Sequence, residues 1–130
     1  MGSQRRLRVL AVEDDPSLLN FYGSFLEEEG YEVRLASNGL EGLQEVGWGP
    51  DLILLDLGMP IMDGYEFLRR LRASPDTTHI PVLVLSGATV KDKDRAALNA
   101  QAVLQKPFDF ARLLSAVEAF ARRAPGAAQS

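Results

Sequence analysis

The chain has no cysteine and a single histidine, His79, among its 130 residues. The first absence excludes a disulfide framework, a thiolate zinc site, an iron–sulfur cluster and a cysteine nucleophile, and it fits a reducing cytoplasm. One histidine excludes a multi-histidine metal site. His79 lies in a predicted loop, where a phosphotransfer histidine is not expected.

Basic residues and long apolar runs are also scarce. There are 14 Lys and Arg against 18 Asp and Glu, a formal net charge of −4, which disfavours a surface that coats nucleic acid. No apolar run approaches the ~20 residues of a membrane helix, and residues 1–6 are not followed by a signal-peptide core. We therefore expect a cytoplasmic protein that directly contacts neither nucleic acid nor a membrane.

What the sequence does contain is ordinary globular composition in an alternating pattern. Hydrophobic residues are 46% and charged residues 25%, which is typical of one folded domain at this length. We expect that domain over residues 7–123, with an N-terminal tail at 1–6 and a flexible C-terminal tail at 124–130. Short apolar runs at 7–12, 31–35, 51–56, 81–85 and 102–104 predict strands. Amphipathic segments at 16–29, 38–46, 65–73, 91–99 and 110–123 predict helices.

A strand–helix alternation of this kind favours a parallel sheet with right-handed crossovers. The continuous apolar runs at 51–56 and 81–85 indicate strands buried on both faces, whereas the alternating run at 31–35 indicates a half-exposed edge strand. We expect an α/β fold, a flavodoxin-like doubly wound (βα)5 domain. Its five-stranded parallel sheet should have the order 2-1-3-4-5.

Polar side chains gather where the predicted strands end, which is where open parallel sheets form their sites. Glu13 and Asp14 follow the first strand, Asp56 ends the third, Ser86 follows the fourth and Lys106 follows the fifth. Two carboxylates ~4 Å apart repel by about 4 kcal/mol at an effective dielectric of about 20, so such a cluster needs a cation. Mg²⁺ prefers oxygen ligands and often binds carboxylates together with a phosphate. The pattern predicts a site for Mg²⁺ and a phosphoryl group.

Each of these residues alone also has a plain structural interpretation. Glu13 or Asp15 can belong to a solvated loop with a helix cap, Asp56 can cap a turn, Lys106 can be a surface lysine, and Ser86 can be a turn residue. Their joint occurrence at consecutive strand ends is what favours a site.

Four motifs in these positions are similar to those of a known family. They are Val-Leu-Ala-Val-Glu-Asp-Asp-Pro at 9–16, Asp-Leu-Ile-Leu-Leu-Asp-Leu-Gly-Met-Pro-Ile-Met-Asp-Gly at 51–64, Val-Leu-Val-Leu-Ser-Gly-Ala at 82–88 and Lys-Pro-Phe at 106–108. From residue 7 to about 122, the chain resembles the receiver domain of two-component response regulators.

The resemblance implies a metal site and a phosphoacceptor. Asp56 is expected to take a phosphoryl group from a phosphohistidine on a sensor histidine kinase. Mg²⁺ is expected on Asp14 directly, on Glu13 through water, on Asp56, and on the main-chain carbonyl of Gly58. The resemblance also implies that Ser86 and Lys106 bind the phosphoryl oxygens, and that the bond from Lys106 to Pro107 is cis. Such a domain is not a turnover enzyme: it promotes only its own phosphorylation and dephosphorylation.

The chain departs from the family pattern at positions that affect the output signal and the lifetime of the phosphorylated state. Many receivers carry an aromatic residue three positions before the lysine, where this chain has Val103. Residues 99–102 lack the Gly-Ala-Asp-Asp common in DNA-binding regulators, which weakens the case for their usual dimer, although a homodimer is possible. Gly58 and Ala88 are small at positions that tune hydrolysis in the family. The expected partners are a sensor kinase or phosphotransfer protein and a downstream protein target.

Three other functions remain open at this point. A Mg²⁺-dependent phosphohydrolase with an aspartyl-phosphate intermediate needs a second acid two residues after Asp56, where Gly58 stands. A flavin or nucleotide binder needs a phosphate-binding loop after the first strand, where the acids stand. A receiver-like scaffold that takes no phosphate is disfavoured by the complete set of site residues.

Overall fold

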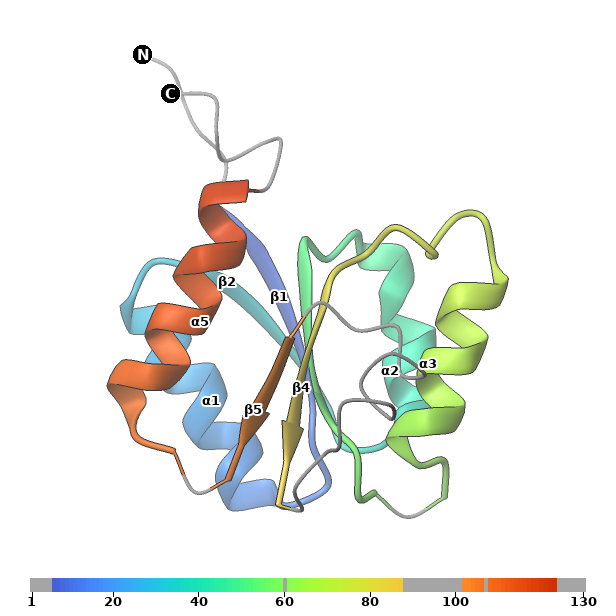
Figure 1. Cartoon of the computed structure of the whole chain (residues 1–130), viewed down its shortest axis with the longest axis horizontal. Helices are drawn as coiled ribbons and strands as arrows, with labels where there is room; N and C mark the ends of the chain where they lie inside the picture. Colours follow the sequence, from blue (N-terminus) through green and yellow to red (C-terminus); the bar gives the residue numbers. More distant parts are fainter. Residues whose placement is uncertain (1–5, 60, 88–101, 107, 124–130) are drawn as a thin grey trace.

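The computed structural model describes residues 6–59, 61–87, 102–106 and 108–123, and its ribbon is shown in Figure 1. Strands and helices alternate as the sequence predicts, except that the helix expected at 91–99 lies outside the described residues. The strands are β1 (Arg8–Val12), β2 (Glu32–Ala36), β3 (Leu52–Asp56), β4 (Val82–Ser86) and β5 (Ala102–Gln105). The helices are α1 (Pro16–Glu28), α2 (Gly39–Glu45), α3 (Gly64–Ala73) and α5 (Phe110–Arg123), with a 3-10 helix, η1, at Val46–Trp48.

The strands form one parallel sheet in the order β2-β1-β3-β4-β5, which confirms the predicted fold class. Every residue of β3 and of β4 is buried, whereas most of β2 is not. The continuous apolar runs are therefore the central strands, and the alternating run is an edge strand.

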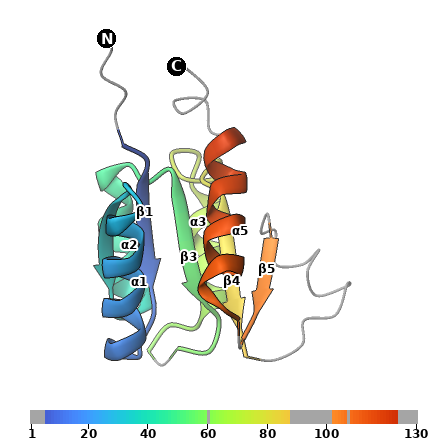
Figure 2. The same cartoon turned by 90° about the vertical axis from the view of Figure 1, so that its left-hand side faces the viewer.

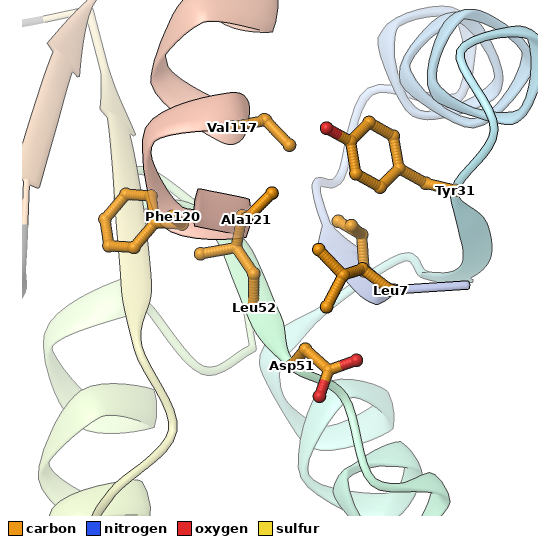
Figure 3. A pocket seen from close by; sticks show the side chains of 8 residues that line it. Leu7, Tyr31, Asp51, Leu52, Val117, Phe120 and Ala121 are labelled. Atoms are coloured by element: carbon orange, nitrogen blue, oxygen red, sulfur yellow. The ribbon is translucent and has the colours of Figure 1, made fainter. Parts of the chain in front are cut away.

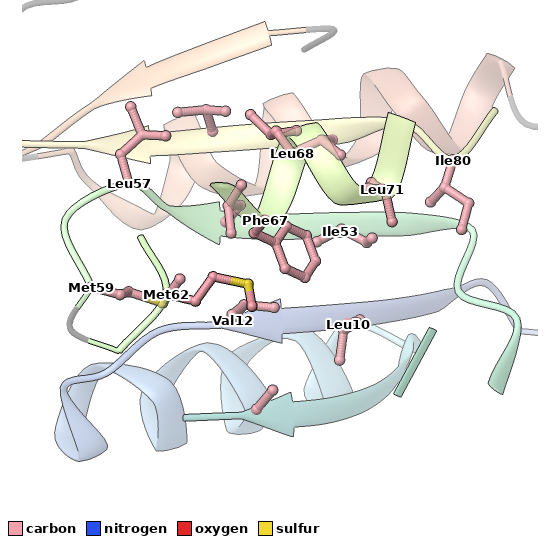
Figure 4. Packing of buried hydrophobic residues seen from close by; sticks show 14 residues of the cluster. Leu10, Val12, Ile53, Leu57, Met59, Met62, Phe67, Leu68, Leu71 and Ile80 are labelled. Carbon is pink, nitrogen blue, oxygen red and sulfur yellow. The ribbon is translucent and has the colours of Figure 1, made fainter. Parts of the chain in front are cut away.

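Helices cover both faces of the sheet. In Figures 1 and 2, α1 and α5 lie on one face and α2 and α3 on the other. Each face has its own apolar cluster, because successive side chains of a strand point to opposite faces. One cluster, shown in Figure 4, packs the strands against Phe67, Leu68 and Leu71 of α3. The other packs them against α1 and α5.

Helix boundaries follow local capping chemistry. The carboxylate of Asp15 accepts hydrogen bonds from the backbone N–H groups of Ser17 and Leu18 at the start of α1, and Asp63 caps α3 in the same manner. Pro16 is the first residue of α1, as expected for a residue without an N–H to satisfy. Past the end of α1, Gly30 has a φ of +100°, a conformation that glycine adopts most readily.

Two features lie at the amino ends of the strands. Trp48 is half-buried, and the guanidinium carbons of Arg8 and Arg34 lie 5.3 and 5.0 Å from its ring centroid, within the range of a cation–π contact. A cavity of about 10 Å³ lies between the starts of β1 and β3 and the end of α5, with Leu52, Val117 and other apolar side chains around it (Figure 3). That volume corresponds to about one water molecule, so it is not a ligand site.

Candidate functional site

The carboxyl ends of four neighbouring strands bring the candidate residues together. Val12 pairs with Leu55, so Glu13 and Asp56 follow paired residues on adjacent strands. Backbone hydrogen bonds continue past the strand ends: the N–H of Glu13 donates to the carbonyl of Ala36 at 3.1 Å, and that of Lys106 donates to the carbonyl of Ser86 at 2.7 Å. The main chain therefore holds these residues along one edge of the sheet.

Three carboxylates meet at this edge. Glu13, Asp14 and Asp56 each offer an oxygen atom, and these atoms lie within 4.8 Å of one another. Glu13 is 2% exposed and Asp56 is 7% exposed, while Asp14 lies nearer the surface. The expectation that separate strand ends would bring these acids together is met by the geometry.

Lys106 supplies the nearby positive charge. Its Nζ lies 3.1 Å from Oε1 of Glu13 and 3.7 Å from Oδ1 of Asp56. The closer partner is therefore Glu13 rather than Asp56. Among the described residues, the Lys106 ammonium is the positive charge that the ion pairs place beside the three carboxylates, which leaves excess negative charge in this part of the site.

The carboxyl group of Glu13 is affected by both its burial and the neighbouring charges. Burial raises the pKa of its carboxyl above the usual value, and the charge of Asp56 raises it further. The N–H of Asp15, which donates to Oε2 of Glu13 at 3.2 Å, and the ammonium of Lys106 oppose this rise. The raised pKa means that nearby positive charges and hydrogen bonds do not fully stabilise the negative charge of the Glu13 carboxylate. A bound cation would add the missing stabilisation.

The loop after β3 is open beside Asp56. The N–H of Gly58 donates to Oδ1 of Asp56 at 3.3 Å, and apart from the chain neighbours, no heavy atom of the described residues lies within 4 Å of the position that a Cβ on Gly58 would take. A phosphoryl group that approaches Asp56 from this side meets no side chain from residue 58.

The donor set fits Mg²⁺. An octahedral ion with oxygen ligands at 2.0–2.1 Å separates those oxygens by about 3.0 to 4.2 Å. One carboxylate oxygen from each of the three acids lies within 4.8 Å of the other two, close to this range. Glu13, Asp14 and Asp56 are therefore the residues that would hold the ion.

Ser86 is the remaining predicted site residue, and it is 4% exposed at the end of β4, beside Lys106 in the sheet. Val103 is half-buried and packs against the apolar cluster on the α2–α3 face. The predicted cis bond at Pro107 and the small residue Ala88 lie outside the described residues.

Tyr22 is a buried aromatic residue whose surroundings include the acids of the site. It is 2% exposed on α1, and its ring stacks on Phe108 with centroids 6.5 Å apart. Burial raises the pKa of its phenol, and the charges of Glu13, Asp56 and Asp15 raise it further. The sequence pattern carries no signal for this electrostatic influence of the acids on Tyr22.

Comparison with known proteins agrees with this geometry. The family model described as "Response regulator receiver domain" matches residues 9–118. The chain belongs to this family. Receiver domains are signalling phosphoacceptor domains, so the coarse function of the chain follows from its family membership. The match lies inside the predicted domain of residues 7–123, whose exact boundaries stay a prediction.

One curated relative and two solved structures illustrate the similarity. The chain is 39% identical over 119 residues to the DNA-binding dual master transcriptional regulator RpaA of Synechocystis, with 89% of this chain and 49% of that protein covered. The chain thus spans about half the length of the curated relatives it matches. The chemotaxis protein CheY4 of Vibrio cholerae superposes with a TM-score of 0.83 at 32% identity, over 89% of this chain and 99% of that one.

The second structure is the response regulator TrrA of Thermotoga maritima, solved in complex with Mg²⁺ and BeF. It has a TM-score of 0.77 and 30% identity, over 88% of this chain and 98% of that one. Within the described part of the present chain, no helix is both long and apolar enough to cross a membrane.

Proposed function

We propose that this receiver accepts a phosphoryl group on Asp56 in a reaction that requires Mg²⁺, and that a sensor histidine kinase or a phosphotransfer protein is the donor. The observation that carries the proposal is the meeting of Glu13, Asp14 and Asp56 within 4.8 Å beside the Lys106 ammonium. Support also comes from TrrA, which has the same fold and was solved with Mg²⁺ and BeF.

The reaction is an in-line displacement at phosphorus. A carboxylate oxygen of Asp56 forms a bond to phosphorus while the bond from phosphorus to the histidine nitrogen of the donor breaks, and the leaving imidazole takes up a proton. Negative charge spreads over the three remaining phosphoryl oxygens, so catalysis rests on position and electrostatics. When bound, Mg²⁺ neutralises part of that charge.

The chain's own side chains have separate tasks in this scheme. Asp56 is the nucleophile, and its carboxylate is oriented by the N–H of Gly58. Lys106 lies close enough to both Glu13 and Asp56 to move its ammonium toward phosphoryl oxygens. Ser86 is assigned the role of hydroxyl donor to the same oxygens, and the carbonyl of Gly58 that of a further metal ligand.

Phosphorylation then changes the charge at the carboxyl edge of the sheet. A neutral acyl linkage replaces the Asp56 carboxylate, and the phosphoryl oxygens add about two negative charges. That change favours conformations in which Lys106 and Ser86 contact the new group, and the altered surface signals through protein contacts. A downstream protein is the expected target, a homodimer is possible, and the absence of direct nucleic-acid contact stays a prediction.

The test is to incubate the chain with acetyl phosphate and Mg²⁺ and to measure its mass. We expect one phosphoryl adduct, mapped to Asp56, that is absent with EDTA and absent in Asp56→Asn. An unmodified chain under these conditions favours a scaffold that takes no phosphate. Sustained release of inorganic phosphate from a phosphomonoester favours a phosphohydrolase instead.

A further inference from the structure

The loop between β3 and α3 is closed at its base and anchored on its inner side. The N–H of Gly64 donates to the carbonyl of Leu57 at 3.0 Å, which ties the two ends of the loop together. Met59 and Met62 are 6% and 7% exposed and pack in the apolar cluster on the α2–α3 face (Figure 4). These contacts hold the loop against the body of the protein.

Ile61 lies in the same loop but is exposed to solvent, unlike Met59 and Met62. Both its exposure and its backbone conformation are unusual for an isoleucine. It is 80% exposed, the highest value among the exposed large hydrophobic residues. Its φ is +71°, and it is the described non-glycine residue with a positive φ. A β-branched residue is a rare outlier in this region, and such a conformation costs about 1–3 kcal/mol. The stability of the fold therefore explains neither the exposure of the Ile61 side chain nor the positive φ of its backbone.

The position of Ile61 relative to Asp56 limits what can contact it. Ile61 follows Asp56 by five residues, so their Cα atoms are at most ~17 Å apart even in an extended chain. The loop turns back to Leu57, which brings them closer than this limit. A protein partner covers about 800 Å² of surface, a disc of ~16 Å radius. A protein that docks over Asp56 can therefore reach Ile61, whereas a small phosphoryl donor does not need to contact it.

Other exposed apolar side chains adjoin the loop. Tyr65, at the start of α3, is 52% exposed, and Leu40, at the start of α2, is 47% exposed. The α2 helix begins against the loop, because the carbonyl oxygen of Met62 lies 2.9 Å from the position of a Cβ on Gly39. Both exposed side chains therefore belong to helices that start beside the loop between β3 and α3.

We propose that Ile61 is an apolar recognition residue for the protein that delivers the phosphoryl group to Asp56, and that the left-handed loop conformation holds it out toward that donor. This inference rests on the proposed function and adds a residue that determines donor specificity. Ile61 takes no part in the chemistry itself, since neither its side chain nor its backbone contacts the carboxylates in any observed interaction.

The test compares two donors on two variants. Asn tolerates positive φ and removes the apolar side chain, so Ile61→Asn deletes the contact without adding strain. Ile61→Val keeps a branched apolar side chain and is the matched control. The donors are acetyl phosphate and the autophosphorylated catalytic cores of a panel of sensor histidine kinases, of which the core that labels the wild-type chain fastest is used.

With the kinase core, we expect kcat/KM for Ile61→Asn to fall about 10-fold, which corresponds to loss of most of a buried isoleucine contact. We expect Ile61→Val, which loses one methylene group, to stay within about 4-fold of the wild type by the same arithmetic. Labelling by acetyl phosphate should be unchanged in both variants, because that donor does not reach residue 61. A loss with the kinase alone supports the proposal.

Other outcomes overturn it. Equal loss with both donors means that residue 61 acts on the geometry of the site, and no loss with the kinase means that the donor does not contact it. If acetyl phosphate labels the chain but no kinase core does, a sensor kinase is not the partner that Ile61 contacts. A wild-type dimer that Ile61→Asn dissociates identifies a second copy as the occupant. If neither donor labels Asp56, the proposed function itself fails, an outcome distinct from all of these.

Discussion

Replacement of Asp56 by asparagine should stabilise the chain when Mg²⁺ is absent. Asparagine has nearly the same shape and can still accept the hydrogen bond from the N–H of Gly58, so the substitution removes mainly a charge. That charge stands against two other carboxylates and one ammonium group. The sign of the effect depends on whether repulsion or attraction is larger.

The distances decide this balance. Asp56 lies within 4.8 Å of ligand oxygens of both Glu13 and Asp14, and each such pair repels by about 3.5 kcal/mol at an effective dielectric of about 20. Its attraction to Lys106 across 3.7 Å is about 4.5 kcal/mol on the same basis. Repulsion therefore exceeds attraction by ~2–3 kcal/mol, and solvent near Asp14 reduces that excess. We expect Asp56→Asn to raise the free energy of unfolding by about 1–2 kcal/mol, or roughly 4–8 °C in Tm.

The assay is urea and thermal unfolding of the wild type and the variant, in EDTA and in Mg²⁺. An ion that binds the folded state stabilises it by mass action, so Mg²⁺ should raise the Tm of the wild type. The same addition should have little effect on Asp56→Asn, because one ligand has lost its charge. Asp76→Asn is the matched control: Asp76 is exposed in the loop after α3, and its substitution should change neither stability nor the response to Mg²⁺.

Two results would refute this reasoning. If Asp56→Asn is less stable than the wild type in EDTA, Lys106 compensates the acids fully and the site has no need of a cation. If Mg²⁺ stabilises both proteins equally, the ion binds elsewhere and the assigned ligand set is wrong.

The remaining predictions concern packing, capping and titration. Gly42→Ala should lower the free energy of unfolding by about 1–2 kcal/mol in urea titrations, because a Cβ there would lie 2.9 Å from the ring of Phe67. Gly47→Ala, with no atom within 4 Å of the new methyl group, is its control and should be neutral. Asp15→Ala should cost about 1 kcal/mol of stability through loss of the α1 cap, while Asp15→Asn should cost little. Hydrogen bonds from two arginines lower the pKa of Glu66 to about 2, so its NMR titration should have its midpoint there. The stability that this carboxylate contributes should be present above its unfolded pKa and lost as pH falls toward 2.

Much of the fold could be predicted from the sequence, because burial leaves a direct trace in it. A strand with helices on both faces must be apolar throughout, so the apolar run at 52–56 is by itself sufficient to identify a central strand. The alternating run at β2 likewise identified an edge. Local chemistry indicated the helix ends, such as Pro16 at the start of α1 and Gly30 beyond its end.

The meeting of the acids could also be predicted, since parallel strands end at one edge of the sheet. The partner choice of Lys106 could not, because preference for Glu13 over Asp56 depends on differences of less than 1 Å in side-chain position. Nor could the left-handed backbone of Ile61, because a β-branched residue gives no sequence signal for a positive φ. Periodicity indicates whether a side chain is buried, but not which charged groups influence it, as Tyr22 illustrates.

The position of Trp48 gives this protein a built-in fluorescent reporter that is insulated from its own chemistry. It is the sole tryptophan, and its ring contacts the guanidinium groups of Arg8 and Arg34 near the amino ends of the strands, with the length of β3 between it and Asp56. Its fluorescence emission should change on global unfolding but not when an ion or a phosphoryl group binds at the acidic edge formed by Glu13, Asp14 and Asp56. Its fluorescence can therefore report denaturation without interference from binding at the acidic edge.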